Sequence, residues 1–386
     1  MSTATIETIS AASSDRLYMS MELGEGVWKL GFTRGFGEKL VKRRVASRDV
    51  EAILKAIASV KKALGLAGGV EVRSGYEAGR DGFWLHRFLV SHGVRNLVMD
   101  SSSLEVNRRS RRAKTDDLDT VGLLDLLVRY WLQGSKKPFR VVRVPTIEEE
   151  DRRHLHRDLQ CAKRERVRVT NRMKGLLASH GATMDLSRAD AGERLSRLRQ
   201  WDGSPLPSGL LGRLRREWKR VVSCTEMIRG LEAERREILR ARPDPVIEKV
   251  LQLNTLRGIG INSAWLYVME FFGWREFRNG KEVGALAGLT PTPFQSGSRH
   301  REQGMSHAGN RHVRGMSVEI AWGWLRFQPK SQLSLWYEER FGHGSKRLRK
   351  IGIIALARKL LIALWRFLET GVLPEGAELK AHPAIR

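Results

Sequence analysis

The sequence predicts an α/β domain followed by a long, mostly helical remainder. Short apolar runs separated by glycine and charge fill residues 17–45, which is typical of consecutive strands. Two later stretches rich in Arg, Glu and Leu, residues 146–180 and 207–242, space their apolar residues as long helices do. At 386 residues the chain exceeds one usual core, so we expect two or three packed units. The expected domains are residues 1–145, 146–245 and 246–386.

The amino-terminal domain is predicted to follow the order β-β-β-α-β-α-β, because its apolar runs alternate between strand-like and helical spacing. A further helix, apolar on most faces, is expected to pack against the sheet before Pro138 and Pro145 end the domain. The segments are residues 17–45 for three strands, 49–66 for a helix, 70–72 for a strand, 83–92 for a helix, 94–99 for a strand and 118–132 for the last helix.

The remaining chain is predicted to be helical. Residues 146–180 and 207–242 predict a helical hairpin or coiled coil, joined by a connection that contains glycines and prolines. From residue 246 onward the pattern is mostly helical, apart from an irregular polar stretch, residues 290–310, that has no periodicity. Trp322 and Trp324 lie in an apolar helical pattern, so we expect both in the core rather than stacked on bases.

The net charge of the chain indicates which kinds of binding partner to expect. A formal net charge of +26 favours nucleic acid, because Lys and Arg contacts to phosphates release counterions, with a membrane surface as the competitor. The membrane is disfavoured: the amino terminus lacks a charged-then-apolar signal pattern, and the apolar residues 351–368 include three cations. Two cysteines are too few for a disulfide framework or a thiolate metal site, so we expect free thiols and a cytoplasmic location.

Carboxylates are expected at the ends of the predicted sheet. Glu22 lies on the first strand, Glu77 just after the fourth, and Asp116 and Asp119 open a helix on one of its faces. Such acids suit paired Mg²⁺ ions, which stabilise the attacking and leaving oxygens of a phosphodiester. Acids at these positions are as readily explained as helix caps or solvated charges. Spacing also does not exclude Glu25, Glu71, Asp81 and Asp117.

A basic run directly precedes two of these acids. Five cations before Asp116 favour contact with a nucleic-acid backbone over an ordinary solvated loop. The run consists of Arg108, Arg109, Arg111, Arg112 and Lys114.

Two loops of the last domain are further candidates. Gly258 and Gly260 predict a hairpin between helices, whose backbone can approach a phosphate, although a lone pair of glycines is often only a tight turn. Ser296 lies beside glycine in a loop with Arg299 and Arg301, and these cations would favour its alkoxide as a nucleophile on phosphorus. Composition alone favours a flexible turn over a nucleophile.

Four motifs follow one another over nearly the whole chain. They are Tyr76-Glu77-Ala78-Gly79 with Gly82-Phe83-Trp84, Arg112-Ala113-Lys114-Thr115-Asp116 with Asp119, Gly288-Leu289-Thr290-Pro291 with Gln295-Ser296-Gly297, and Ala355-Leu356-Ala357-Arg358-Lys359-Leu360-Leu361. In order and separation they resemble bridge-RNA-guided transposases of the insertion-sequence family numbered one hundred and ten, and their relatives among site-specific DNA invertases.

The resemblance implies a ribonuclease-H-like (RuvC-like) amino-terminal domain with Mg²⁺ at Glu22, Glu77, Asp116 and Asp119. It also implies that Ser296, in a mostly helical carboxy-terminal domain, attacks double-stranded DNA of the element ends and the target and forms a phosphoserine link. A structured bridge RNA would pair with both DNAs. A coiled-coil arm would join protomers into a dimer, or a tetramer in the synaptic complex, with an active site shared between subunits.

Two positions depart from the family pattern. The first acid is usually Asp, and Glu22 adds one methylene, while His307 stands where the family often has Lys. Three alternatives stay open: a metal-dependent nuclease resembling a Holliday-junction resolvase, in which Ser296 is only a turn; a non-catalytic nucleic-acid-binding scaffold; and a membrane-surface protein. The last is disfavoured because basic residues are spread over all three expected domains.

Overall fold

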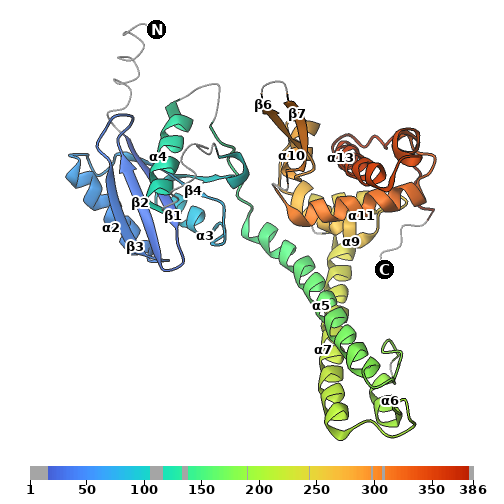
Figure 1. The fold of residues 1–386 in the computed structure, drawn as a ribbon. Helices are drawn as coiled ribbons and strands as arrows, with labels where there is room; N and C mark the ends of the chain where they lie inside the picture. Colours follow the sequence, from blue (N-terminus) through green and yellow to red (C-terminus); the bar gives the residue numbers. More distant parts are fainter. Residues whose placement is uncertain are drawn as a thin grey trace. The chain divides into compact units, whose positions relative to one another are not determined.

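The computed structural model describes residues 16–104, 116–132, 138–188, 190–242, 244–296, 299–306 and 309–381. The chain divides into two compact units, Met1–Pro145 and Thr146–Arg386. The first contains the sheet and the second is mostly helical (Figure 1).

The first unit is built on a five-stranded sheet with the order β3-β2-β1-β4-β5 (Figure 1). Its strands are β1 (Arg16–Leu23), β2 (Val27–Thr33), β3 (Val41–Ala46), β4 (Glu71–Glu77) and β5 (Arg95–Met99). The first three form an antiparallel meander, whereas β4 is parallel to β1 and β5 is parallel to β4. The helices are α2 (Val50–Ala63), α3 (Trp84–Ser91) and α4 (Asp116–Leu132), with the short η1 (Ser101–Ser103) after β5. The element order predicted from the sequence is confirmed, although Glu77 ends β4 instead of following it.

Side chains of the central strands alternate between two cores. Leu17, Met19 and Met21 of β1 pack with Ile53 of α2 on one face, whereas Tyr18 packs with α4 on the other. This alternation follows from the two-residue period of a strand. Because both faces of β1 are buried, its sequence is a nearly continuous apolar run.

Helix α4 lies close to the sheet because two strand positions facing it are glycines. A Cβ atom on Gly31 would lie 3.0 Å from both Ser20 Oγ and Thr120 Cγ2, and one on Gly75 would collide with the Met99 side chain. At this close approach the buried Ser20 hydroxyl donates a 2.8 Å hydrogen bond to the Thr120 carbonyl. The first turns of α4 are thereby fixed to β1.

The second unit begins with two long helices, α5 (Ile147–Ala178) and α7 (Ser208–Ala241), which lie side by side as an arm (Figure 1). The segment that joins them contains α6 (Ala191–Arg194) and η3 (Leu195–Arg197). Thr146 starts α5 with a reciprocal capping box to Glu149. Apolar residues such as Leu159 and Ile228 pack between the helices, and ion pairs such as Lys163–Glu232 at 2.7 Å connect them. The helical hairpin predicted from the sequence is confirmed.

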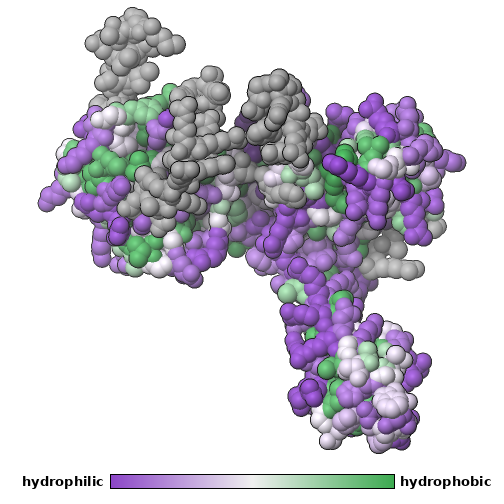
Figure 2. All heavy atoms as spheres, viewed as in Figure 1, coloured by the Kyte–Doolittle hydropathy of each residue, from purple (hydrophilic) through white to green (hydrophobic). Residues whose placement is uncertain are grey.

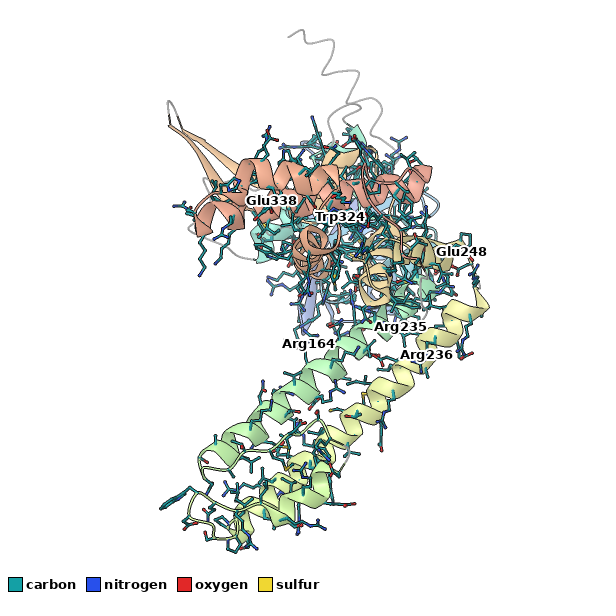
Figure 3. The ribbon with its side chains drawn as sticks, turned by 90° about the vertical axis from the view of Figure 1, so that its right-hand side faces the viewer. Arg164, Arg235, Arg236, Glu248, Trp324 and Glu338 are labelled. Carbon is teal, nitrogen blue, oxygen red and sulfur yellow. The ribbon has the colours of Figure 1, made fainter. Side chains whose placement is uncertain are left out.

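The rest of the second unit is a bundle of shorter helices. They are α8 (Pro245–Asn254), α9 (Ile261–Tyr267), η4 (Val268–Phe272), α10 (Gly280–Leu286), α11 (Arg311–Phe327), α12 (Gln332–Tyr337), η5 (Glu338–Gly342) and α13 (Lys346–Thr370). Trp324 is fully buried among them (Figure 3), but Trp322 is 47% exposed, so the prediction that both are core residues is wrong for Trp322. Residues two positions apart on a helix are rotated by about 200°, so Trp322 and Trp324 lie on opposite faces of α11.

The polar stretch predicted to be irregular is a hairpin. β6 (Pro291–Ser296) pairs antiparallel with β7 (Arg299–Met305) in a separate two-stranded sheet. The prediction is wrong because two strands alone need no buried face and therefore lack the apolar alternation that reveals a strand. A two-stranded ribbon also tolerates prolines such as Pro293, since both strands are edges.

The surface is largely hydrophilic on the face that Figure 2 shows, particularly along the arm. Within the ranges that the structure describes, no helix has both the length and the apolar character needed to cross a membrane. Cys161 and Cys224 are free thiols, as predicted.

Candidate functional site

Glu22 and Glu77 lie at the carboxyl ends of two neighbouring parallel strands. The register of β1 with β4 pairs Met21 with Tyr76, and the two glutamates are the next residues of their strands. Alternation from Ser20 and Gly75 places both on the sheet face that α4 covers. Both line one cavity of about 420 Å³. The structure therefore brings together two of the acids predicted from the sequence.

Asp119 belongs to the beginning of α4. The hydrogen bond from Ser20 to Thr120 fixes the adjacent residue of the helix to β1, two residues before Glu22. Asp119 is partly buried, and Asp116 is the first residue of the helix, with its side chain outside the described part. Among the described His, Cys, Asp and Glu side chains, no group of three or more is close enough to hold a metal ion. The set of four acids stays a prediction.

The acids present fit Mg²⁺ in their chemistry. This ion takes carboxylate oxygens, and one or two carboxylates suffice because it keeps several waters and shares the oxygens of a phosphate. Glu22 and Glu77 supply such oxygens to one cavity. Their carboxylates are thus of the kind that this ion prefers, and its binding to the four acids stays a prediction.

Three of the four rival acids have described side chains, and each of them forms an ion pair. Asp81 lines the same cavity, but it accepts a 3.2 Å hydrogen bond from Arg48. Glu25 forms a 3.5 Å ion pair with Arg80. Glu71 lies at the opposite end of β4, six residues or roughly 20 Å from Glu77 along the strand. The Asp117 side chain and the basic run of Arg108, Arg109, Arg111, Arg112 and Lys114, like His307, lie outside the described residues.

Ser296 is the last residue of β6, where the register pairs it with Arg299; Arg301 pairs with Phe294. The side chains of Ser296, Arg299 and Arg301 are not among those described, so their roles stay predictions. Two backbone hydrogen bonds hold the base of the hairpin. Ser306 N donates to Thr290 O at 3.0 Å, and Asn310 N donates to Leu286 O at 3.1 Å.

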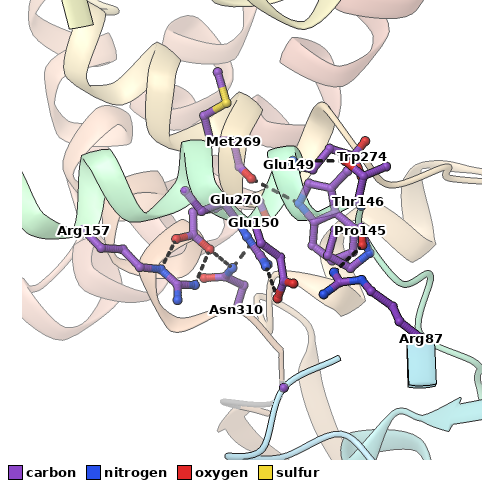
Figure 4. A network of polar contacts seen from close by, with 12 residues as sticks. Arg87, Pro145, Thr146, Glu149, Glu150, Arg157, Met269, Glu270, Trp274 and Asn310 are labelled. Atoms are coloured by element: carbon purple, nitrogen blue, oxygen red, sulfur yellow. Dashed lines mark hydrogen bonds and ion pairs between the residues drawn. The ribbon is translucent and has the colours of Figure 1, made fainter. Parts of the chain in front are cut away.

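A buried carboxylate lies behind this hairpin base. Glu270 is 1% exposed and accepts two hydrogen bonds from the Arg157 guanidinium of α5, at 2.7 and 2.9 Å. Asn310 donates a third at 3.0 Å while its own oxygen caps α11 (Figure 4). Burial acts to raise the pKa of Glu270, but Arg157 and Asn310 outweigh it, so this pKa lies below its usual value. The carboxylate thereby connects the arm to the segment that follows β7.

His156 and Arg235 extend this polar interior. Arg235 of α7, 3% exposed, donates to the Asn262 side chain at 2.5 Å (Figure 3 shows its position on the helix). Burial, followed by the charge of Arg235, lowers the pKa of His156 to about 4, so His156 is neutral near pH 7. Sequence reasoning missed this network. One signal was available: Glu270 interrupts the apolar run of residues 265–272, and a charge at a buried position requires a partner.

Gly258 and Gly260 lie between α8 and α9, as predicted. Gly258 has φ +91°, which favours glycine, and Gly260 is the N-cap of α9. Lys380 donates to Ile259 O at 2.7 Å, and Gln328 donates to Arg257 O at 2.9 Å. Contacts with Gln328 and Lys380 are thus one explanation of this loop, and its contact with phosphate stays a prediction.

Comparisons with known proteins connect both units to one group. Residues 251–335 match the family described as "Transposase IS116/IS110/IS902 family". The chain is 39% identical over 382 residues to "Putative transposase y4rJ" of Sinorhizobium fredii (strain NBRC 101917 / NGR234), which covers 94% of each chain. It is 26% identical over 233 residues to "Transposase for insertion sequence element IS1328" of Yersinia enterocolitica, covering 60% of this chain and 66% of the relative. It is 24% identical over 245 residues to "Transposase for insertion sequence element IS1111A" of Coxiella burnetii, covering 61% and 63%.

Proposed function

Because the chain belongs to the IS116/IS110/IS902 family of transposases, we propose that it cuts and rejoins the DNA of its insertion sequence with two chemical groups, the acids of the first unit and Ser296 of the second. The observation that carries the proposal is the placement of Glu22 and Glu77 at neighbouring strand ends in one cavity. Clustered carboxylates on a protein of charge +26 suit a reaction on a phosphodiester.

The reaction proposed is a transfer of the phosphoryl group to serine. The Ser296 oxygen forms a bond to phosphorus, the bond from phosphorus to the leaving deoxyribose oxygen breaks, and the hydroxyl proton moves to that oxygen through solvent. Religation reverses the exchange with a different DNA end. Mg²⁺ bound by Glu22 and Glu77, with Asp116 and Asp119, would stabilise the charge that develops on the phosphate oxygens.

The proposal extends to fold and partners. The amino-terminal unit is proposed to be a ribonuclease-H-like domain, and a structured bridge RNA to guide the protein to target and donor DNA. The arm of α5 and α7 is proposed to join copies of the chain into dimers and tetramers. The RNA and DNA partners are supported by the positive charge, and the assembly by the length of the arm, 32 and 34 residues in its two helices.

The test is a search for nucleotide attached to Ser296. The full chain is incubated with a DNA junction of its element, the element's RNA and Mg²⁺, and its peptides are analysed by mass spectrometry. We expect an adduct on Ser296 that Ser296→Ala removes together with strand cleavage. An adduct on another serine would overturn the site assignment, and cleavage without any adduct would replace the serine mechanism by metal-dependent hydrolysis.

A second experiment tests the role of the acids. Glu22→Gln and Glu77→Gln keep the size of each side chain but remove its charge, and each is expected to reduce cleavage by at least about 100-fold, the scale of one lost electrostatic contact to a transition state. The matched control is Glu25→Gln, which changes a carboxylate of the same cavity that is paired with Arg80. Equal cleavage by all three variants would refute the assignment of the acids.

A further inference from the structure

A row of charged residues crosses the α4 face of the sheet at the level of Glu22. The register pairs Glu22 of β1 with Lys29 of β2, and Lys29 with Arg44 of β3. Paired residues of antiparallel strands point to the same face, so all three belong to the face that carries Ser20 and Gly31. Lys42, opposite Gly31, adds a fourth member to that face. On this face of the sheet, cations of β2 and β3 therefore lie next to the acid of β1.

The cations surround a second cavity. Lys29, Lys42 and Arg44 line a hollow of about 320 Å³ together with Thr120 of α4, and none of the described residues that line it is acidic. Lys42 and Arg44 are exposed, and Lys29 is partly buried. Both exposed cations belong to β3, the edge strand of the five-stranded sheet. The acidic cavity borders β1 and β4, and the basic cavity borders β2 and β3.

Strand pairing by itself disfavours part of this arrangement. Like charges directly opposite one another on neighbouring strands are destabilising, and Lys29 opposite Arg44 is such a pair. Lysines on an outer strand also discourage strands from adding to the sheet, but that purpose does not require a cavity bounded by the helix that carries Asp119. A bound polyanion would offset the repulsion between the cations.

We propose that Lys29, Lys42 and Arg44 bind backbone phosphates of the DNA strand on one side of the bond that is cut. This inference rests on the proposed function, because it takes the acids as the place of cleavage. Two strand spacings separate Glu22 from Arg44, roughly 10 Å. At a rise of about 3.4 Å per nucleotide, this corresponds to roughly three nucleotides of one DNA strand. The row therefore orients the strand across β2 toward β3.

The experiment measures how DNA binding depends on salt. Lys42→Ala with Arg44→Ala removes two cations and leaves Lys29, the partner of Glu22, in place. Affinity for a duplex that contains the element end is measured by fluorescence anisotropy in EDTA, from 50 to 200 mM NaCl. Two lost phosphate contacts reduce the slope of log affinity against log salt by about 1.8, so the wild type loses roughly 12-fold more affinity over this range than the variant.

Matched variants separate a contact from a general loss of charge. Lys55→Ala with Lys62→Ala removes two exposed lysines of α2, which packs on the opposite face of the sheet, and should leave the slope within about 0.3 of the wild type. Lys42→Arg with Arg44→Lys keeps both charges and should keep the wild-type slope. An unchanged slope in the Lys42/Arg44 alanine variant, or equal losses in the α2 variant, would overturn the proposal. The proposal would also be overturned if the Lys42/Arg44 alanine variant changed binding of the element's RNA but not of its DNA.

The two proposals fail separately. If Glu22→Gln leaves cleavage intact while the slope of the Lys42/Arg44 alanine variant falls as expected, the acids are misassigned and the cations bind phosphates away from the cleavage site. If cleavage requires Glu22 but the slope is unchanged, the proposed function stands and the phosphate row falls.

Discussion

Lowering the pH from 7.5 to 5 is expected to destabilise the second unit by about 2 kcal/mol through one side chain, His156. This residue is 2% exposed, and its Nδ1 has no hydrogen-bond partner in the part of the chain that the structure describes. The titratable groups that act on its pKa are Lys163 on its own helix, Arg235 on α7, Glu270 in η4 and His312 on α11. Burial, then the charge of Arg235, lowers its pKa from 6.5 to about 4.

The size of the effect follows from the two pKa values. Below pH 6.5 the unfolded chain binds a proton at this histidine, whereas the folded chain does not until about pH 4. The contribution to stability is therefore complete above pH 6.5 and is lost as the pH falls toward 4. The full shift of about 2.5 units corresponds to about 3.4 kcal/mol at 1.36 kcal/mol per unit, of which about 2 kcal/mol is lost between pH 7.5 and 5.

The assay compares the wild type with His156→Gln, which cannot titrate. Urea unfolding is followed by the NMR signal of the Met269 methyl group, a buried probe of the second unit, because a chain of two units does not unfold as one transition. The wild type should lose about 2 kcal/mol more than the variant between pH 7.5 and 5. Glu270 titrates in both proteins, so its contribution cancels. Equal losses, or an NMR midpoint for His156 near 6.5, would refute the reasoning.

Three further substitutions test the contacts that position the candidate groups. Arg157→Ala leaves a buried carboxylate without its cation and should lower the free energy of unfolding of the second unit by about 3 kcal/mol, whereas Arg164→Ala, on the exposed side of the same helix, should change it by less than about 0.5 in the same urea assay. Ser20→Ala removes the hydrogen bond to Thr120 and should cost about 1 kcal/mol, seen as faster hydrogen exchange at the start of α4 but not in α2. Gly309→Ala should slow serine-adduct formation and lower the melting temperature, because the position has φ +89° and its new Cβ would collide with a backbone carbonyl; an unchanged melting temperature would contradict this.

Local patterns were sufficient to predict the elements of the first unit but not their neighbours. The runs around Leu17, Trp28 and Val98 indicate strands because buried strands are apolar, and the helical spacing of Ile53 and Ile57 indicates α2. In the sheet, β4 lies next to β1, and this brings Glu77 beside Glu22. Local sequence patterns do not contain the order of strands in a sheet. The acids could be proposed from the sequence, whereas their shared cavity required the fold.

The polar interior of the second unit was less predictable for a physical reason. Glu270 and Arg157 are 113 residues apart, and their meeting depends on how α5 crosses η4. A lone acid within an apolar run signals that some partner must exist, but it does not identify the partner. The hairpin of β6 and β7 escaped prediction for another reason: its two strands pair only with each other, and their sequence lacks the apolar alternation that indicates a strand.

These two features are connected, and the connection bears on Ser296. A two-stranded hairpin is marginally stable by itself, so the direction in which its tip points depends on what holds its base. The base is held by the backbone of Leu286 and Thr290 and by Asn310, whose amide is bound to Glu270. Glu270 is bound in turn to Arg157 of the arm. A continuous series of contacts therefore leads from α5 through Glu270 and Asn310 to the base of the hairpin that contains Ser296.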